Sequence, residues 1–196
     1  MWDERYAEPG FAYGTEPNDF LVQAAHNIPP GPVLCLAEGQ GRNAVFLAGL
    51  GHPVTAVDQS AVGLSKARQL ATERGVHIET EVADLADFDL GDGRWAGIVS
   101  IFCHLPPDLR RNVYAAAVQA LVPGGVLVLE AYTPAQLTHR TGGPQVIELL
   151  ASQATLQAEL AGLEWLEARE IERDIHEGPY HNGRSAVVQL VGRRVA

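Results

Sequence analysis

Short apolar runs alternate with segments of helical periodicity along most of the chain. Residues 33–37 and 54–57 are continuous apolar runs bounded by glycine or proline, and residues 43–50 between them carry apolar side chains at helical spacing. Runs of this length indicate strands that are buried on both faces, and a helix joining two of them is typical of a β-α-β unit in a parallel sheet. The pattern therefore predicts an α/β fold.

The same alternation continues to the C-terminus. Capping residues mark the helix starts, and glycine-proline clusters mark the turns. The last two apolar segments flank "HEGPYHNG", which predicts an antiparallel hairpin that closes the sheet. The expected elements after the first unit are a helix from Ser60 to about Arg74, strands at 76–83 and 95–102, a helix from Pro107 to Leu121, a strand at 122–132, a helix at 145–161, and the hairpin strands 163–175 and 184–194.

Length and composition suit one domain. A chain of 196 residues with 46% hydrophobic residues can bury a single well-filled core. We expect one domain over residues 1–196, in which residues 31–196 form the sheet core. Residues 1–30 precede the first strand and are expected as a helical lid segment over the edge of the sheet that binds ligand.

The net charge of the chain indicates which kind of partner it can bind. A formal net charge of −10, with no basic stripe, opposes binding to a nucleic-acid backbone and favours a small molecule. The start "MWDERYAEPG" lacks the features of a signal peptide, and no apolar run is long enough to span a bilayer. Cys35 and Cys103 lie in apolar stretches and are expected as core thiols in a reducing compartment. These features predict a cytoplasmic monomer or homodimer without membrane or nucleic-acid partners.

A glycine-rich turn follows the first predicted strand. Gly39 and Gly41 have no Cβ, so the backbone there can turn sharply and come close to a ligand. Asp58 ends the second strand, where a carboxylate can accept hydrogen bonds from ribose hydroxyls. With Ala44, the two glycines also satisfy the G-x-G-x-x-A pattern of dinucleotide-binding proteins. An NAD-dependent oxidoreductase therefore stays open as an alternative.

Glu38, directly before the first glycine, separates the possible ligands. A carboxylate in this turn repels a pyrophosphate and attracts an ammonium group. S-adenosylmethionine offers both an ammonium group for Glu38 and a ribose for Asp58. The competing interpretations are that Glu38 is a surface carboxylate at a helix N-terminus and that Asp58 is a cap before Ser60.

Several motifs resemble those of a known family. "LAEGQGRNAVFLAGLGHPVTAVDQS" resembles the first two motifs of class I S-adenosylmethionine-dependent methyltransferases, in particular the tellurite-resistance-type branch, and the G-x-G-R-N form is its specific part. "VADLADFDL", "IVSIFCHLPPDLRRNV" and "LVPGGVLVLEAYTP" resemble later motifs, so that the likeness covers residues 33–134. The start "WDERYAEPGFAYGTEPNDFL" resembles the branch's aromatic-rich lid, and "ERDIHEGPYHNGRSAVVQLVGRR" resembles its terminal hairpin.

The resemblance implies a fold, an activity and a cofactor. The fold is a doubly wound, Rossmann-like, mostly parallel seven-stranded sheet with an antiparallel C-terminal hairpin strand and helices on both faces. The activity is methyl transfer from S-adenosyl-L-methionine, with S-adenosyl-L-homocysteine as product (EC 2.1.1.-); a non-catalytic module that binds the cofactor is a further alternative. The residues implied in cofactor binding are Trp2, Tyr6, Tyr13, Gly14, Thr15, Glu38, Gly39, Gly41, Arg42, Asn43, Asp58, Gln59, Ser60, Asp84, Leu85, Ile101 and Phe102.

Catalytic candidates lie in two places. His104 follows the fourth strand, where this fold brings a general base near the transferred methyl group; the competing interpretation is a histidine packed at a helix start. His176, His181 and Arg184 lie in the terminal hairpin and are expected to bring a base and a cation together for a thiolate, selenite or tellurite acceptor, unless they are solvated turn residues. No metal is expected, because the spacing of the histidines fits no zinc signature.

The acceptor is expected to be a small soft nucleophile. Enzymes that methylate amines of nucleic-acid bases carry an Asn/Asp-Pro-Pro-aromatic loop after the fourth strand. Here the loop reads Leu105-Pro106-Pro107-Asp108, with neither the polar residue before the prolines nor the aromatic residue after them. Together with the acidic charge, this argues against methylation of nucleic-acid bases.

Overall fold

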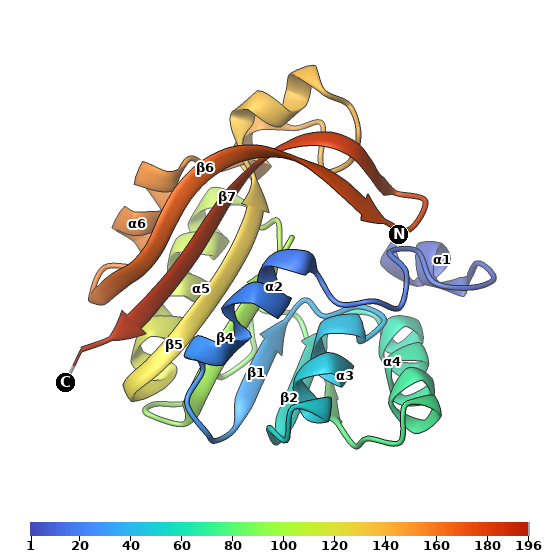
Figure 1. The fold of residues 1–196 in the computed structure, drawn as a ribbon, viewed down its shortest axis with the longest axis horizontal. Helices are drawn as coiled ribbons and strands as arrows, with labels where there is room; N and C mark the ends of the chain where they lie inside the picture. Colours follow the sequence, from blue (N-terminus) through green and yellow to red (C-terminus); the bar gives the residue numbers. More distant parts are fainter. Residues whose placement is uncertain (196) are drawn as a thin grey trace.

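Seven strands form one sheet in the order β3-β2-β1-β4-β5-β7-β6 in the computed structural model, which describes residues 1–195 (Figure 1). The five strands β1 to β5 run parallel, whereas β7 pairs antiparallel with both β5 and β6. This is the predicted doubly wound, mostly parallel sheet with an antiparallel C-terminal hairpin. The strands are β1 (Val33–Leu36), β2 (Val54–Asp58), β3 (Glu79–Val82), β4 (Trp95–Ile101), β5 (Leu121–Tyr132), β6 (Leu163–Glu177) and β7 (His181–Arg194).

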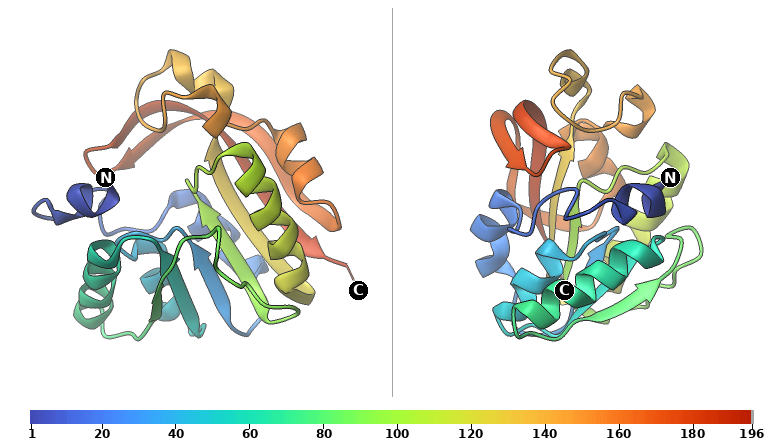
Figure 2. Two further views of the ribbon diagram at one scale, coloured as in Figure 1. Left: turned by 180° about the vertical axis from the view of Figure 1, so that it is seen from behind. Right: turned by 90° about the vertical axis from the view of Figure 1, so that its right-hand side faces the viewer.

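Helices cover both faces of this sheet (Figures 1 and 2). Helices α2, α3 and α4 pack on one face, and α5 and α6 pack on the other. The helices are α1 (Trp2–Ala7), α2 (Asp19–Ala24), α3 (Arg42–Gly49), α4 (Ala61–Glu73), α5 (Pro107–Ala120) and α6 (Gln153–Glu159), with 3₁₀ turns η1 (Ala25–Asn27), η2 (Pro134–Thr138) and η3 (Ile147–Leu149).

The central strands are buried on both faces, as their continuous apolar runs predict. In β1, Val33 and Cys35 point into the core under α2, α3 and α4, whereas Leu34 and Leu36 point into the core under α5 and α6. Side chains alternate between the faces of a strand, so a strand that lies between two helical layers must be apolar at every position.

The predicted helix at 145–161 is wrong in its extent. Only η3 and the short helix α6 form there, because Leu150 adopts an extended backbone and the Ala151 N–H donates to the Tyr132 carbonyl at the end of β5, 3.3 Å away. Ser152 then caps α6 by accepting a hydrogen bond from the Thr155 N–H. The chain therefore leaves the helical path to satisfy backbone groups at the sheet edge.

The N-terminal segment divides between two positions. Helix α1 lies beyond the carboxyl ends of the strands, beside α4, whereas α2 packs on a face of the sheet (Figures 1 and 2). The long β6–β7 hairpin arches over the same edge, and its turn comes close to α1 (Figure 1). The first and the last part of the chain thus meet above the carboxyl ends of the parallel strands.

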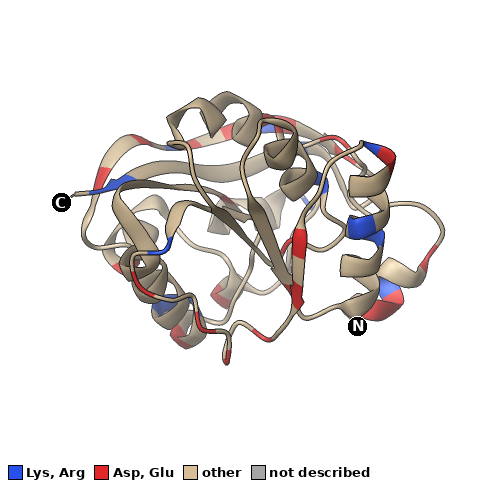
Figure 3. Cartoon of the chain, turned by 90° about the horizontal axis from the view of Figure 1, so that it is seen from below, with Lys and Arg blue, Asp and Glu red and all other residues tan. Residues whose placement is uncertain are grey.

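No helix within residues 1–195 is long and apolar enough to cross a membrane. Acidic and basic positions are interspersed along the ribbon seen from below in Figure 3 rather than gathered into one basic face.

Candidate active site

The order of the strands predicts a ligand site at the carboxyl ends of β1, β2 and β4, which we call the crevice. The sheet runs outward from β1 in both directions, through β2 on one side and β4 on the other, and open α/β sheets bind ligands where this direction changes. Ala37 directly after β1 and Phe102 directly after β4 both have left-handed backbones, with φ of 48° and 51°. Residues other than glycine rarely adopt this conformation, and such strain collects at functional sites.

The glycine turn between β1 and α3 permits two close contacts. Gly39 and Gly41 have φ of 62° and 88°. A Cβ on Gly39 would lie 2.5 Å from the Tyr6 hydroxyl, and a Cβ on Gly41 would lie 2.5 Å from the Ala67 side chain in α4. The missing side chains therefore let α1 and α4 approach the turn, as well as any ligand in the crevice.

Glu38 points into this turn and accepts two hydrogen bonds from the start of α3. Its Oε1 lies 2.9 Å from the Asn43 N and 2.8 Å from the Ala44 N. Burial raises the pKa of Glu38 to about 7, against the opposing effects of these N–H groups and of Arg42. The carboxylate caps the helix through one oxygen, and within residues 1–195 its Oε2 has no hydrogen-bond donor.

Asp58 joins the two turns that border the crevice. Its Oδ2 accepts the Gly39 N–H and its Oδ1 accepts the Ser60 N–H, each at 2.8 Å. Burial raises the pKa of Asp58, and the same two N–H groups oppose that rise. Asp58 thus serves as the cap before Ser60 and also fixes the glycine turn, while each carboxylate oxygen keeps a lone pair for a further donor.

The N-terminal helix covers this crevice. Tyr6 is buried and packs against both Gly39 and Gly63, so its ring sits between the glycine turn and α4. Trp2 stacks on Tyr6 with ring centroids 5.7 Å apart. The Ser60 hydroxyl donates to Asp3, which ties α1 to the start of α4.

The same segment also contacts the terminal hairpin. The Arg5 guanidinium donates to the Tyr13 hydroxyl at 2.9 Å and lies over the Tyr180 ring, 4.7 Å from its centroid. The Tyr180 hydroxyl donates to Glu8 at 3.1 Å. On the other side, the Lys66 ammonium of α4 donates to the Glu8 carbonyl at 2.6 Å. The lid therefore spans the distance between α4 and the β6–β7 turn.

Five rings from four parts of the chain meet beside the crevice and form what we call the aromatic cluster. Phe102 lies at its centre, 4.6 Å from the Tyr132 centroid and 4.8 Å from the His181 centroid. Tyr13 packs on His181 at 4.5 Å, and His104 stacks on Tyr132 at 5.5 Å. The members of the aromatic cluster are Tyr13, Phe102, His104, Tyr132 and His181.

Within residues 1–195, three polar atoms of this cluster are buried without a hydrogen-bond partner: His104 Nε2, the Tyr132 hydroxyl oxygen and His181 Nδ1. Burial lowers the pKa of His104 to about 4 and also lowers the pKa of His181, so both rings are neutral at pH 7. A buried polar atom that lacks a partner costs stability, and such atoms indicate a place where a ligand completes the hydrogen bonding.

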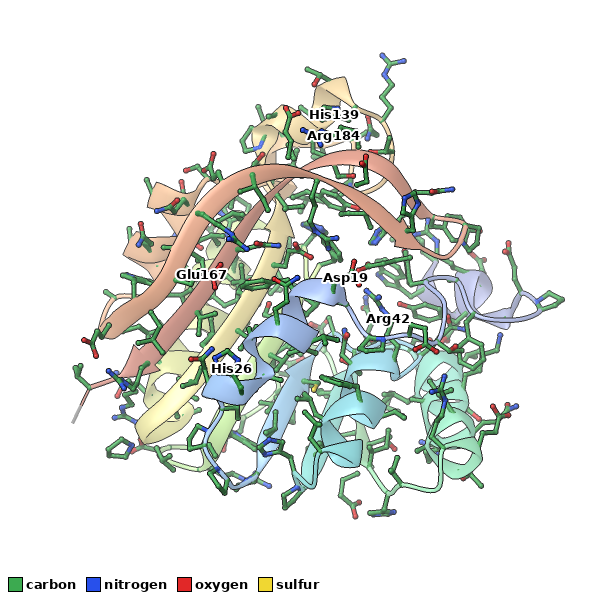
Figure 4. All side chains as sticks on the ribbon, in the orientation of Figure 1. Asp19, His26, Arg42, His139, Glu167 and Arg184 are labelled. Atoms are coloured by element: carbon green, nitrogen blue, oxygen red, sulfur yellow. The ribbon has the colours of Figure 1, made fainter. Side chains whose placement is uncertain are left out.

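A network of buried charges supports the cluster from below. Asn18 donates to Glu130 at 2.6 Å and to Glu177 at 2.8 Å, and its backbone N–H donates to the Asn43 side chain at 2.9 Å. Glu177 pairs with Arg42 at 2.7 Å; Figure 4 labels Arg42 near the top of α3. The network links α2, α3, β5 and the hairpin in one arrangement, which fixes the position of the cluster.

Some predicted residues lie elsewhere. His176 is exposed and bonds to the Asn182 side chain at 2.8 Å, and Arg184 pairs with Glu172. The hairpin pairs His176 with Asn182 and Glu177 with His181, so the expected group of His176, His181 and Arg184 does not form, because neighbouring strand positions face opposite sides. Figure 4 shows Arg184 high on the hairpin, away from Arg42.

The remaining cofactor candidates divide between the crevice and its surroundings. The side chains of Arg42 and Asn43 are engaged by the buried network, whereas the backbone N–H of Asn43 donates to Glu38 in the glycine turn. Asp84 is exposed and accepts the Ala86 N–H at 2.9 Å, whereas Leu85 is buried. The other candidates border the crevice or its lid: Trp2, Tyr6, Tyr13, Gly14, Thr15, Glu38, Gly39, Gly41, Asp58, Gln59, Ser60, Ile101 and Phe102.

Sequence reasoning missed several residues that the fold brings to the site. Tyr132, Glu130, Glu177 and Asn18 were not among the predicted binding or catalytic residues, although Glu130 and Tyr132 end a strand that was correctly predicted. The position at the carboxyl end of a parallel strand was the available signal for these two. Asn18 and Glu177 are 159 residues apart, and no local pattern could have joined them.

A family model described as a methyltransferase domain matches residues 33–125. The match runs from β1 into β5, a little under half of the chain, and contains the glycine turn, Asp58 and the end of β4. No curated protein sequence matches the chain. The match leaves the lid and the hairpin outside the family model.

Solved structures of similar fold cover almost the whole chain. A structure reported for the conversion of a disulfide bond into a thioacetal group during echinomycin biosynthesis has a TM-score of 0.77 and 22% identity, over 98% of this chain and 88% of that one. TehB from Haemophilus influenzae has a TM-score of 0.75 and 19% identity, over 98% of this chain and 65% of that one. The N-methyltransferase NodS from Bradyrhizobium japonicum WM9 in complex with S-adenosyl-L-homocysteine has a TM-score of 0.72 and 16% identity, over 98% of this chain and 96% of that one.

These similarities confirm the predicted fold class. The family match, to a methyltransferase domain, agrees with the predicted S-adenosyl-L-methionine cofactor, and S-adenosyl-L-homocysteine is bound in the NodS structure.

Proposed function

We propose that the protein is an S-adenosylmethionine-dependent methyltransferase that acts on a small soft nucleophile, either a thiol or a chalcogen oxyanion. The observation that carries this proposal is the pair of carboxylates at the carboxyl ends of β1 and β2, where Glu38 enters the glycine turn and Asp58 holds it. An ammonium group and a ribose diol are the complementary ligands for two such acids, and the family match covers both residues.

The residues of the crevice fit this cofactor. Glu38 Oε2 is free to accept from an ammonium group, Asp58 can accept from ribose hydroxyls, and Trp2 and Tyr6 offer aromatic faces to a sulfonium. Bound S-adenosylmethionine supplies a methyl group on a positively charged sulfur. The protein then has to orient the acceptor and exclude water, and the lid and the aromatic cluster are suited to both tasks.

His104 and His181 are the proposed acceptor-side residues. Both are neutral rings of the aromatic cluster, next to the end of β4 where the methyl group is delivered in this fold. A neutral imidazole can take a proton from an acceptor that must lose one. His176 and Arg184 have no such position. The two buried thiols, Cys35 and Cys103, are in keeping with a cytoplasmic location.

The single experiment that tests the proposal is isothermal titration calorimetry with S-adenosylhomocysteine and, separately, with NADH. We expect saturable one-to-one binding of S-adenosylhomocysteine and none of NADH, because Glu38 repels a pyrophosphate. Binding of NADH alone would establish the oxidoreductase alternative. Binding of S-adenosylhomocysteine without turnover of thiols, selenite, tellurite, amines or phenols would establish a non-catalytic binding module.

A further inference from the structure

An open groove runs along the outer side of the aromatic cluster. It has a volume of about 620 Å³ and lies between the loop at residues 140–145 and the β6–β7 turn at residues 179–182. Gly142 is the point of contact with the cluster, because a Cβ there would lie 2.7 Å from the Tyr132 hydroxyl and 3.0 Å from His181 Cδ2. A glycine backbone therefore separates the groove from the unpartnered Tyr132 hydroxyl and from the edge of the His181 ring that carries Cδ2 and Nε2.

The unpartnered polar atoms of Tyr132 and His181 are buried, which indicates that a ligand completes their hydrogen bonding. Tyr132 is fully buried and His181 is 7% exposed, yet the Tyr132 hydroxyl and His181 Nδ1 have no hydrogen-bond partner within residues 1–195. Native proteins satisfy nearly all buried polar side chains. An acceptor that enters from the groove would meet an aromatic wall and a free hydroxyl donor.

His181 has a carboxylate behind it. Its Nδ1 lies 3.5 Å from Glu177 Oε2, a distance that is long for a hydrogen bond but short enough for a strong electrostatic effect. Burial raises the pKa of Glu177, but the His181 and Arg42 side chains outweigh burial and lower it to about 2. Glu177 is therefore ionised at pH 7 and can stabilise a positive charge that develops on the ring.

We propose that the acceptor is a neutral thiol, bound in the aromatic cluster, whose proton is taken by His181 Nε2 while Glu177 orients the ring through Nδ1. This proposal rests on the proposed methyltransferase function and names its substrate class. In it, His181 is a catalytic residue and Glu177 is a positioning residue. Tyr132 contributes its hydroxyl as a donor to the acceptor.

The charges around the cluster argue against an oxyanion. The groups that bear on its polar atoms are Glu130, Glu177 and the arginines Arg42, Arg110 and Arg173. Each of these arginines is paired with a buried carboxylate, Arg42 with Glu177, Arg110 with Glu159 and Arg173 with Glu130. A selenite or tellurite anion that entered the cluster would therefore lose its hydration shell and find no unpaired cation to stabilise its charge. Arg140 lines the groove but is exposed, where water and salt screen its charge.

An alkyl amine is disfavoured for a different reason. It is protonated at pH 7, and an ammonium nitrogen has no lone pair to attack a methyl group. A neutral thiol keeps lone pairs on its sulfur, so its proton can pass to His181 while the new bond forms, whereas an ammonium group must lose its proton completely before it can attack. Sulfur is also well suited to a pocket of aromatic rings.

The reaction step balances without a further reactant. The thiol proton moves to His181 Nε2, and the thiolate sulfur forms a bond to the methyl carbon. The bond between that carbon and the cofactor sulfur breaks, and its electron pair stays on the cofactor sulfur, which becomes neutral. The proton on His181 is released to water afterwards.

The first test compares acceptors on the intact protein, after calorimetry with S-adenosylhomocysteine has established cofactor binding. We expect methylation of ethanethiol and 2,2,2-trifluoroethanethiol and no methylation of selenite, tellurite or ethylamine. Methylation of tellurite as fast as ethanethiol would overturn the choice of acceptor. Absence of cofactor binding would instead remove the proposed function, and cofactor binding without thiol turnover would remove only this inference.

The second test uses His181→Gln and Glu177→Gln. Trifluoroethanethiol matches ethanethiol in shape but is the more acidic thiol, so it depends less on a base. We expect His181→Gln to lower kcat for ethanethiol by about 10²-fold or more, the usual contribution of a general base, and Glu177→Gln to lower it by about 10-fold. Both losses should be smaller for trifluoroethanethiol and should shrink as the pH rises. Glu159→Gln, which alters another buried ion pair, is the matched control.

Equal losses on both thiols at every pH would show that these residues act only on the fold and would overturn the proposal. A readout without turnover is the histidine NMR titration of the protein bound to S-adenosylhomocysteine. Because Glu177 favours the charged ring, Glu177→Gln should lower the pKa of His181 further, and an unchanged pKa would refute the positioning role.

Tyr132→Phe gives a variant that is expected to fold. Its hydroxyl has no partner in the protein, so its removal should leave the midpoint of urea unfolding unchanged or raise it. We expect a rise of about 10-fold in the KM for ethanethiol, the value of one hydrogen bond to the acceptor. Tyr114→Phe, which loses a buried hydrogen bond to Ser100 far from the groove, should lower stability and leave KM unchanged. The reverse pattern would place the acceptor elsewhere.

Discussion

The affinity for S-adenosylhomocysteine should fall as the pH is lowered from about 8 to about 6, because Glu38 has to be ionised to hold an ammonium group. Burial raises the pKa of Glu38 to about 7. Above that pH the carboxylate is charged and attracts the ligand, whereas below it the group is protonated and the attraction is lost. One pH unit below the pKa, about one molecule in ten remains ionised, so Kd should rise about tenfold, which corresponds to about 1.4 kcal/mol.

The structure indicates how to remove the charge without removing the helix cap. In Glu38→Gln the amide oxygen can still accept the Asn43 and Ala44 N–H groups that Oε1 accepts in the protein. The substitution removes the charge-assisted hydrogen bond between Glu38 and the ligand, which contributes about 1.5 to 3 kcal/mol to the binding free energy, so Kd at pH 8 should rise by about ten- to a hundredfold. The variant should then show little further change with pH.

Calorimetric titrations of the wild-type protein and of Glu38→Gln across this pH range provide the assay. The ligand's own ionisation affects both proteins equally and cancels in the comparison. Glu81→Gln, on the exposed edge strand β3, serves as the control and should follow the wild-type curve. If Kd has the same pH dependence in the wild type and in Glu38→Gln, the ammonium group is not held by this carboxylate and the reasoning fails.

Three further changes test the fold and the lid. Gly41→Ala should lower the free energy of unfolding, measured in urea, by about 2 to 4 kcal/mol, because φ at this position is 88° and the new Cβ would meet α4. The control Gly75→Ala, with φ of 68° but open space around its Cβ, should lower it by about 1 kcal/mol, and equal losses would contradict the close approach of α4 to Gly41. Glu130→Ala should lower the free energy of unfolding by about 3 to 5 kcal/mol, because it leaves buried donors unpaired. The exposed Glu164→Ala should lower it by less than about 1 kcal/mol, and an equally small loss for Glu130→Ala would show that the buried network does not stabilise the fold. Tyr6→Ala should speed the dissociation of S-adenosylhomocysteine about tenfold or more in stopped-flow measurements, since Tyr6 covers the glycine turn, and an unchanged rate would deny it the role of a lid.

The cofactor crevice could be predicted from the sequence because its signals are local. The strand before Glu38, the glycine turn and the strand that ends at Asp58 lie within one β-α-β unit, and a parallel sheet brings the carboxyl ends of such strands to one edge. The role of Glu38 could not be decided in the same way. From the sequence, a position at the helix N-terminus was the competing interpretation to ligand binding. In the structure Glu38 caps α3 through Oε1, and its Oε2 can still accept a hydrogen bond from a ligand.

The acceptor side depends on pairings that no local pattern contains. The register of the β6–β7 hairpin places His176 and His181 on opposite faces, and a shift of one residue would put both histidines on the same face. Tyr132 joins the cluster because β5 runs further than its parallel neighbours and pairs with β7. Arg42 was expected at the cofactor but turns to Glu177, 135 residues away in the chain. Such long-range ion pairs are visible only once the fold is known.

The aromatic cluster draws Tyr13 from one end of the chain and His181 from near the other. The two rings pack with their centroids 4.5 Å apart, so the acceptor side of the proposed site exists only while both segments are in place. A molecule in which either segment detaches would keep the glycine turn and lose the aromatic wall.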